Sequence, residues 1–398
     1  MVGLGAMVGA GVFSAWGPAA AAAGSGVLVA LGLAAVVAYC NATSSARLAA
    51  RYPASGGTYV YGKERLGRFW GYLAGWGFVV GKTASCAAMA LTVGLYVWPG
   101  HARVVAVAAV LVLTLVDYLG VQKAAWLTRA VVAGVLLLLA ALVAVCLGSP
   151  AADPARLSVG ASLTPAGVLR AAGLLFFAFA GYARVATLGE EVRDPARTIP
   201  RAVSTALGIT LVVYAAVAVA LLAVLGPGGI AGATAPLAEA VRAAGAPGLA
   251  PLVRVGAAVA ALGSLLALIL GVSRTTLAMA RDHHLPPALA AVHPRHQVPH
   301  RAALAVGAVV AVLAATTDLR GVIGFSSFGV LAYYAVANAA ALTLTPAERR
   351  PPLAVPVLGL AGCLALAFAL PLTSVVTGAA VLGLGAAAYA VRTRLVRR

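Results

Sequence analysis

Acidic residues, and charge in general, are scarce in this chain. Only 10% of its 398 residues are charged, and 28 Lys and Arg stand against 10 Asp and Glu. A soluble protein of this size carries about 25% charged residues, so the composition excludes a soluble globular protein. The hydrophobic share of 62% and the mean hydropathy of +1.00 predict a polytopic membrane protein instead.

The chain also lacks the side-chain groupings that enzymes and metal sites need. Its four cysteines, Cys40, Cys86, Cys146 and Cys363, are far apart within apolar runs and form no CxxC pair, which is typical of small buried hydrophobic residues. The sequence contains no HExxH motif and no paired acids within an apolar run. We therefore expect no metal and no cofactor. An intramembrane enzyme is disfavoured, and so is a channel, which would need polar residues along a continuous path.

The apolar runs are long and unbroken, which predicts helices rather than the strands of a membrane barrel. A helix needs about 20 apolar residues to cross a hydrocarbon core of roughly 30 Å. By this measure the sequence predicts twelve transmembrane helices, at about 1–22, 26–46, 69–98, 102–119, 124–147, 166–189, 203–225, 251–279, 302–317, 321–344, 354–370 and 372–391.

The net charge of +18 could indicate a nucleic-acid partner, but the distribution of the basic residues argues for another role. Most of them lie in alternate connections between the expected helices, where they set the orientation in the membrane. With twelve helices, this asymmetry places both termini in the cytoplasm of a multi-pass protein of the cell membrane. The expected partner is then the lipid bilayer, and not a nucleic acid.

Two of the expected helices contain glycine where a regular helix should continue. The first, MVGLGAMVGAGVFSAWGP, has Gly3, Gly5, Gly9 and Gly11, and the sixth has Gly181 within FAFAGYARVATLGEE. Glycine inside a helix costs about 1 kcal/mol relative to alanine, so these residues either allow close helix packing or mark breaks. Helices one and six are corresponding members of two five-helix halves. Paired interruptions there indicate a transporter site near the bilayer midplane.

Three motifs resemble the amino acid–polyamine–organocation (APC) superfamily of permeases, nearest to its cationic-amino-acid-transporter-like branch. GLGAMVGAGVF (3–13) resembles the unwound first helix of that family, and ARYPASGGTYVYGKERLG (50–67) resembles its loop between helices two and three. FFAFAGYARVATLGEEVRDPARTIPRA (176–202) resembles its sixth helix and the following loop. The number and spacing of the spans extend the resemblance over nearly the whole chain.

The resemblance implies one all-α transmembrane domain with the fold of the leucine transporter. Two inverted five-helix repeats would cover about 1–148 and 166–345, and two extra helices about 354–391. It also implies that backbone groups of two unwound segments hold a small-molecule substrate. These would be Met7, Val8, Gly9, Ala10 and Gly11 in the first helix and Phe179, Ala180, Gly181 and Tyr182 in the sixth.

The sequence departs from the family's pattern at several positions. Ala183 stands where many relatives have an acid, so no carboxylate can contact a substrate or carry a proton there. The helix expected at 124–147 lacks the buried lysine that replaces a sodium ion in some relatives. Few residues precede the expected break in the first helix, so we expect the natural reading frame to begin upstream of Met1.

Acids follow the sixth helix, on the side expected to be cytoplasmic. Glu190 and Glu191 either pair with basic loop residues and close the inner face, or are solvated loop charges.

Three basic residues lie within the expected helices: Lys82, Arg184 and Arg274. The two arginines are near helix ends, where a long side chain reaches the interface. Lys82 lies roughly 20 Å from the expected cytoplasmic end of its helix, at ~1.5 Å per residue, and no acid lies deep in any expected span. A group that gains and loses a proton there can drive transport. Lys82 is therefore the candidate coupling residue, with a structural polar contact as the alternative.

Together with the resemblance, these features predict a secondary active transporter of amino acids rather than an enzyme. The substrates would be neutral or broadly varied amino acids, carried by proton coupling or by exchange. A permease for polyamines or other organic cations is the alternative. The absence of an acid at Ala183 argues mildly against strongly cationic substrates.

Overall fold

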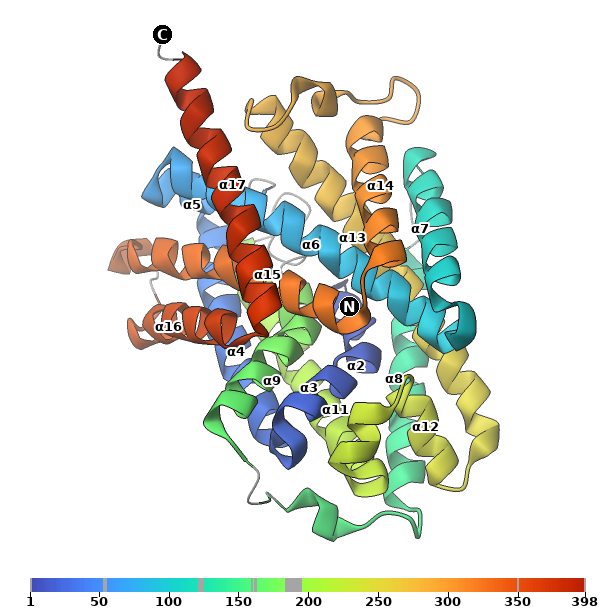
Figure 1. The fold of residues 1–398 in the computed structure, drawn as a ribbon. Helices are drawn as coiled ribbons and strands as arrows, with labels where there is room; N and C mark the ends of the chain where they lie inside the picture. Colours follow the sequence, from blue (N-terminus) through green and yellow to red (C-terminus); the bar gives the residue numbers. More distant parts are fainter. Residues whose placement is uncertain are drawn as a thin grey trace.

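Helices form close to the positions that the sequence predicts in the computed structural model of the chain (Figure 1). The structure describes residues 2–52, 56–120, 125–158, 160, 163–182, 195–348 and 351–396, and no strand occurs in these ranges. The α-helices are α1 (Val2–Met7), α2 (Gly11–Ser14), α3 (Trp16–Ala23), α4 (Val27–Arg51), α5 (Thr58–Leu66), α6 (Arg68–Val97), α7 (Ala102–Tyr118), α8 (Ala125–Leu147), α9 (Pro165–Phe179), α11 (Pro195–Gly232), α12 (Pro236–Ala243), α13 (Ala250–Arg281), α14 (His300–Thr316), α15 (Leu319–Leu342), α16 (Ala354–Ala369) and α17 (Leu372–Val396).

The length and apolar composition of the helices indicate a membrane protein. In the described ranges, eight helical segments are long and apolar enough to cross a bilayer. Three shorter apolar helices, α9, α14 and α16, occupy further predicted spans. Because lipid offers no hydrogen bonds, helices that pair their own backbone groups suit this setting. The predicted all-helical, multi-pass class is confirmed.

The structure corrects the sequence prediction in two connections. The segment 50–67 was expected to be a loop, but its second half forms the helix α5. The helix α11 continues past its predicted end, and its geometry breaks at Gly226, with φ 65° and ψ 171°. Pro227 explains this break, because a proline disfavours helical geometry in the residue before it.

Buried polar side chains join the helices α4, α15 and α16. The Nδ2 atom of Asn338 in α15 donates to Oδ1 of Asn41 in α4 at 2.6 Å, and Sγ of Cys363 in α16 lies 3.3 Å from the same oxygen. Both asparagines are fully buried. All four cysteines are buried and free, as the sequence predicts. These contacts fix a scaffold beside the first and sixth predicted spans.

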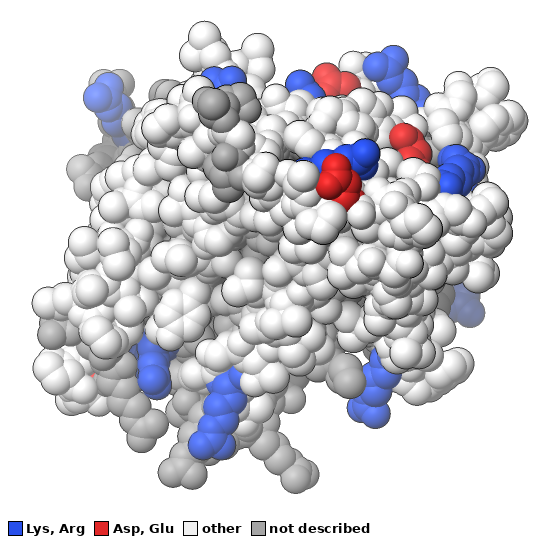
Figure 2. Space-filling model, turned by 90° about the horizontal axis from the view of Figure 1, so that it is seen from below, with Lys and Arg blue, Asp and Glu red and all other residues white. Residues whose placement is uncertain are grey.

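The surface is apolar over a wide area. Figure 2 shows a broad uncharged belt across the face it draws, with Lys, Arg, Asp and Glu gathered toward its two margins. Large apolar side chains such as Leu137 and Leu384 are 72% and 68% exposed. Such exposure is unfavourable in water and suits contact with lipid.

The short helix α5 is held against two distant parts of the chain by ion pairs. Glu348, after α15, accepts from Arg65 of α5 and from Arg51 at the end of α4, where Nε lies 3.1 Å from Oε1. The backbone N–H of Thr345 donates to its other oxygen at 2.9 Å. The N–H of Thr345, Arg65 and Arg51 together lower the pKa of Glu348 to about 2.

A second carboxylate holds α5 to the end of α13. Asp282 Oδ2 accepts from the hydroxyl of Tyr59 at 2.5 Å and from Nζ of Lys63 at 3.2 Å. Partial burial alone would raise the pKa of Asp282, but the bonds from Tyr59 and Lys63 hold it below its ordinary value. The helix α5 is thus fixed by charge at two points.

We predict that Glu348→Gln loosens α5 without unfolding the bundle. The substitution removes the charge that Arg51 and Arg65 share, and exposed ion pairs contribute little to global stability. Hydrogen exchange of the α5 amides should speed up about two- to fivefold, measured by mass spectrometry.

The matched control is Glu64→Gln, an exposed carboxylate on α5 that has no ion-pair partner among the described residues.

In the wild type the ionised Glu348 stabilises the folded form fully above its ordinary pKa of 4.5, and this effect is lost as pH falls through about 2. Equal exchange in both variants would show that the Glu348 pairs do not hold α5.

Candidate functional site

The first transmembrane segment is interrupted where the sequence predicts a break. The helix α1 ends at Met7, and helical geometry resumes at Gly11, the first residue of α2. Within the described residues, no backbone acceptor is found for the N–H groups of Gly9, Ala10 and Gly11. Three adjacent buried donors at the break therefore have no backbone partner in the described part of the chain, and leaving such donors unpaired is costly unless something else binds there.

The helix that follows this break is longer than α2 alone. Ala15, between α2 and α3, has helical φ and ψ of −79° and −18°. Its N–H donates to the carbonyl of Gly11 at 3.1 Å, and its carbonyl accepts from Ala19 at 3.2 Å. One nearly continuous helix thus runs from Gly11 to Ala23, and its N-terminal end, with a partial positive charge, lies at the break.

The sixth predicted span also stops in mid-course. Its helix α9 begins after Thr164, whose Oγ1 accepts from the N–H of Gly167 at 3.1 Å, and ends at Phe179. A single 3₁₀ turn follows at Ala180–Tyr182. The α-helix thus ends where the break is predicted, and Tyr182 is the last residue described before 195.

A buried tyrosine of α11 joins the two breaks. The hydroxyl of Tyr214 lies 2.6 Å from the carbonyl oxygen of Met7 and 3.1 Å from that of Ala178, and it can donate to either. Its ring packs edge-on against Trp16 and at a tilt against Phe179, with centroids 6.1 Å and 5.2 Å away. The two interruptions therefore face each other, as the paired glycine pattern predicts.

Two glycines of the first break allow very close approach of its neighbours. A methyl group at Gly11 would lie 2.6 Å from Cα of Ala178, so backbone nearly touches backbone there. A methyl group at Gly9 would lie 2.0 Å from Oγ of Ser264 in α13. Ser264 Oγ is buried and has no hydrogen-bond partner among the described residues. It adds a free polar atom beside the break.

Lys82 reaches the second break. The side chain comes from α6 and is only 5% exposed, and its Nζ donates to the carbonyl of Ala180 at 3.0 Å. No carboxylate of the described residues lies within 4.0 Å of Nζ. Among the described residues, the ammonium is therefore held by a backbone carbonyl and faces no carboxylate, so a positive charge lies beside the site.

The predicted site residues are mostly brought together and buried. Met7, Val8, Ala10, Phe179 and Ala180 are at most 3% exposed. The three glycine positions of the prediction belong to the same breaks, with Gly9 and Gly11 buried and Gly181 partly exposed.

Some predicted residues cannot be placed in this way. The side chain of Tyr182 is not described, although its backbone belongs to the 3₁₀ turn. The predicted closure residues Glu190 and Glu191, and the intramembrane Arg184, lie outside the described residues.

Sequence reasoning missed Tyr214 and Ser264. Tyr214 is the one aromatic residue in the long run TLVVYAAVAVALLAVL, a signal that could have been noticed. Ser264 is one of many small residues in α13, and nothing in its sequence context distinguishes it.

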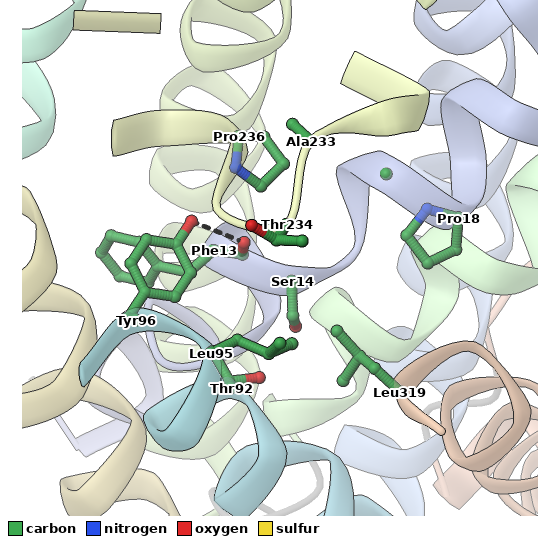
Figure 3. A pocket seen from close by; sticks show the side chains of 11 residues that line it. Phe13, Ser14, Pro18, Thr92, Leu95, Tyr96, Ala233, Thr234, Pro236 and Leu319 are labelled. Carbon is green, nitrogen blue, oxygen red and sulfur yellow. Dashed lines mark hydrogen bonds between the residues drawn. The ribbon is translucent and has the colours of Figure 1, made fainter. Parts of the chain in front are cut away.

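A small cavity lies on one side of the first break (Figure 3). It has a volume of about 40 Å³, and Phe13, Ser14, Thr92, Tyr96 and Pro236 are among the residues that line it. The Tyr96 hydroxyl donates to the carbonyl of Phe13 at 2.9 Å and narrows it further. A cavity needs about 10–15 Å³ of this kind to hold one water molecule, so this one has room for only a few waters, and this side of the break is nearly closed.

The chemistry that this site offers comes chiefly from the backbone. One break presents N–H groups at a helix end, and the other presents carbonyl groups, each able to accept a second hydrogen bond. Within the described part of the chain, no group of three His, Cys, Asp or Glu could hold a metal ion. The arrangement suits a small ligand with an anionic group at one end and donors at the other.

Comparison with known proteins identifies the family of the chain. The chain is 71% identical to an uncharacterized transporter of Mycobacterium tuberculosis over all 398 residues and 90% of that protein. It is 25% identical to the branched-chain amino acid permease BcaP of Bacillus subtilis, over 86% of this chain and 79% of that one. It is 29% identical to human cationic amino acid transporter 4, over 88% and 59% of the two chains. A family model described as "Amino acid permease" matches residues 1–390. The chain therefore belongs to the amino acid permease family, and is a membrane transporter rather than an enzyme.

Proposed function

We propose that this permease is a secondary active transporter of neutral or broadly varied amino acids, driven by proton coupling or by exchange. One observation carries the proposal. Two interrupted helices meet at Tyr214 and at the close contact of Gly11 with Ala178, and the N–H groups of the first break have no backbone acceptor among the described residues. A zwitterionic amino acid has one group for each.

The substrate's carboxylate would bind at the first break. The N–H groups of Gly9, Ala10 and Gly11 have no backbone acceptor, and the helix that follows presents its positive end there. Hydrogen bonds from N–H groups together with a helix end bind an anion without a charged side chain. Met7 and Val8 complete the turn that presents these groups.

The substrate's ammonium would bind at the second break, which includes Phe179, Ala180, Gly181 and Tyr182. The carbonyl of Ala180 already accepts from Lys82, and that of Ala178 lies within reach of Tyr214. A carbonyl oxygen has two lone pairs, so each can also accept from a ligand. The substrate's side chain would then lie between the two breaks.

The arrangement supports a leucine-transporter-type fold of two inverted five-helix repeats, at about 1–148 and 166–345, with two extra helices. Helical segments lie in all twelve predicted ranges, and the breaks fall in the first helix of each half. By the positive-inside rule, the face with α5 and both termini would be cytoplasmic in the cell membrane. Glu190 and Glu191 would then stand at the inner closure.

The charge of Lys82, which has no carboxylate within 4.0 Å among the described residues, favours neutral amino acids over the alternative, a permease for polyamines or organic cations. A cation beside Lys82 would meet repulsion, and Ala183 offers no carboxylate to offset it. The names of the compared permeases cover both branched-chain and cationic amino acids, so the site's own charge is the more direct guide.

Lys82 is also our candidate for coupling proton movement to transport. Its ammonium holds the carbonyl of Ala180, the kind of group that a substrate's ammonium would use. A change in the protonation of Lys82 would hold or release that carbonyl, and so link proton binding to substrate binding.

Uptake by the purified protein in liposomes tests the proposed function. We expect radiolabelled neutral amino acids to accumulate when the outside is more acidic than the inside, or to exchange with unlabelled amino acid within. Absence of both accumulation and exchange, across neutral, acidic and basic amino acids, would contradict amino acid transport.

We predict that Tyr214→Phe weakens substrate binding about three- to tenfold, because a buried hydrogen bond contributes roughly 0.5–1.5 kcal/mol. The ring and its packing remain, but the hydroxyl that joins the two breaks is lost. Isothermal titration calorimetry measures the affinity. Tyr39→Phe, on the exposed side of α4, is the matched control and should bind as the wild type does.

We predict that Lys82→Met loses pH-driven net uptake but keeps substrate exchange. Methionine fills similar space without an ammonium, so the break keeps its packing while the titratable group is gone. Counterflow and net uptake are compared in the same liposomes. Wild-type accumulation under a proton gradient would mean that Lys82 is a structural contact only and that coupling resides elsewhere.

A further inference from the structure

A second hollow, separate from the substrate site, opens where α17 meets the transport helices near α5. It has a volume of about 460 Å³ and lies between α6, the loop after α13 and α17. Tyr72 and Trp76 come from α6, His284 from the loop, and Tyr389 and Arg392 from α17. Neither the proposed substrate site nor the coupling residue uses any of these side chains.

One side of this hollow is apolar and open. Leu384 lines it and is 68% exposed, and Val391, further along α17, is 59% exposed. At the start of α6, Phe69 and Trp70 are 37% and 46% exposed. Aromatic residues of this kind gather at the level of lipid headgroups. The hollow therefore lies at a membrane interface, with an open apolar wall along α17.

The other end of the hollow is basic and partly uncompensated. Burial lowers the pKa of His284, Asp282 raises it, and Lys63, Arg392 and Arg68 lower it further, which places three cations near this imidazole. Asp282 is paired with Lys63 at 3.2 Å. Within the described ranges, neither Arg68 nor Arg392 has a carboxylate within 4.0 Å. Arg392, which lines the hollow, and Arg68, at the start of α6, are thus without an ion-pair partner in the described part of the chain.

We propose that this hollow binds an anionic phospholipid, with its phosphate at Arg392 and an acyl chain along Leu384. Arginine is well suited to phosphate because its planar group donates two parallel hydrogen bonds. Basic pockets between transmembrane helices on the cytoplasmic side bind anionic headgroups in this way. The apolar wall selects a lipid over a free anion, and the unpaired arginines select an anionic lipid over a zwitterionic one.

The lipid would join the outer helix α17 to a helix of the substrate site. Trp76 already links the two, since its Nε1 donates to the carbonyl of Val381 at 2.9 Å. Its ring also lies against Gly385, where a methyl group would be 2.3 Å from it. Trp76 belongs to α6, the same helix as Lys82. Occupancy of the hollow should therefore stabilise the packing of α17 on α6.

The test is thermal unfolding of the purified full chain in detergent, with added lipid. We expect phosphatidylglycerol to raise the melting temperature more than phosphatidylcholine with the same acyl chains, and inorganic phosphate to give no comparable rise. Arg392→Gln should weaken phosphatidylglycerol binding about tenfold in native mass spectrometry. The matched control Arg394→Gln, an exposed arginine of the same helix that does not line the hollow, should keep wild-type binding.

A second variant tests the cavity rather than the charge. Ala388 lines the hollow and is exposed, so Ala388→Phe should fill it without disturbing the core, and should abolish the stabilisation by phosphatidylglycerol. Equal effects of the two phospholipids, or equal losses in Arg392→Gln and Arg394→Gln, would overturn the proposal in favour of general lipid contact. Stabilisation by inorganic phosphate alone would overturn it in favour of a simple anion site.

Discussion

This structure depends on one constraint: where a membrane helix is interrupted, the backbone N–H and C=O groups at the break need other hydrogen-bond partners. A continuous helix satisfies its own N–H and C=O groups, but two interrupted helices cannot, and lipid supplies no partners. Here the protein places donors beside the carbonyls of the breaks: Tyr214 can donate its one hydrogen to Met7 or to Ala178, and Lys82 donates to Ala180. The N–H groups of the first break receive no backbone acceptor within the described residues. In the described part of the chain the site is therefore asymmetric: its carbonyls have donors within reach, and its N–H groups have no backbone acceptor.

This asymmetry depends on the surrounding scaffold. Tyr214 can reach both breaks only because Trp16 and Phe179 fix its ring. Gly11 lets the two breaks approach to backbone contact with Ala178, which no larger residue would permit without displacement. The contact of Lys82 with Ala180 depends on the position of α6. This helix is joined to α15 by a buried hydrogen bond between the hydroxyls of Ser85 and Ser326, whose oxygens are 2.5 Å apart.

Much of the fold could be predicted from sequence, because membrane helices follow from local composition. Apolar length gave the helix positions, and the glycines of the first and sixth spans gave both breaks. The short helix α5 was missed, because its polar segment has no apolar run and is stabilised by ion pairs to distant residues, Asp282 and Glu348.

The site itself was predictable only in part. Backbone breaks follow from local sequence, but the side chains that satisfy them come from elsewhere in the chain. Tyr214 and Ser264 meet the first break across more than 200 positions, and only tertiary packing brings them there. Lys82 could be predicted from sequence, because burying an ammonium in the membrane is costly. Its partner, the carbonyl of Ala180 in the second break, could not be predicted.

Partial satisfaction of the site also bears on how a carrier can release what it binds. If every group of both breaks were unpaired, the empty site would be costly and the ligand would bind too tightly to leave. Because Lys82 and Tyr214 already occupy the carbonyls, a substrate's ammonium gains mainly second hydrogen bonds there or exchanges with Lys82. The net gain of such an exchange is small. The N–H groups of Gly9, Ala10 and Gly11, which have no backbone acceptor among the described residues, then provide most of the binding free energy. The proposed site would therefore bind the substrate's carboxylate strongly and its ammonium weakly. This balance suits a transporter, which must bind its substrate on one side of the membrane and release it on the other.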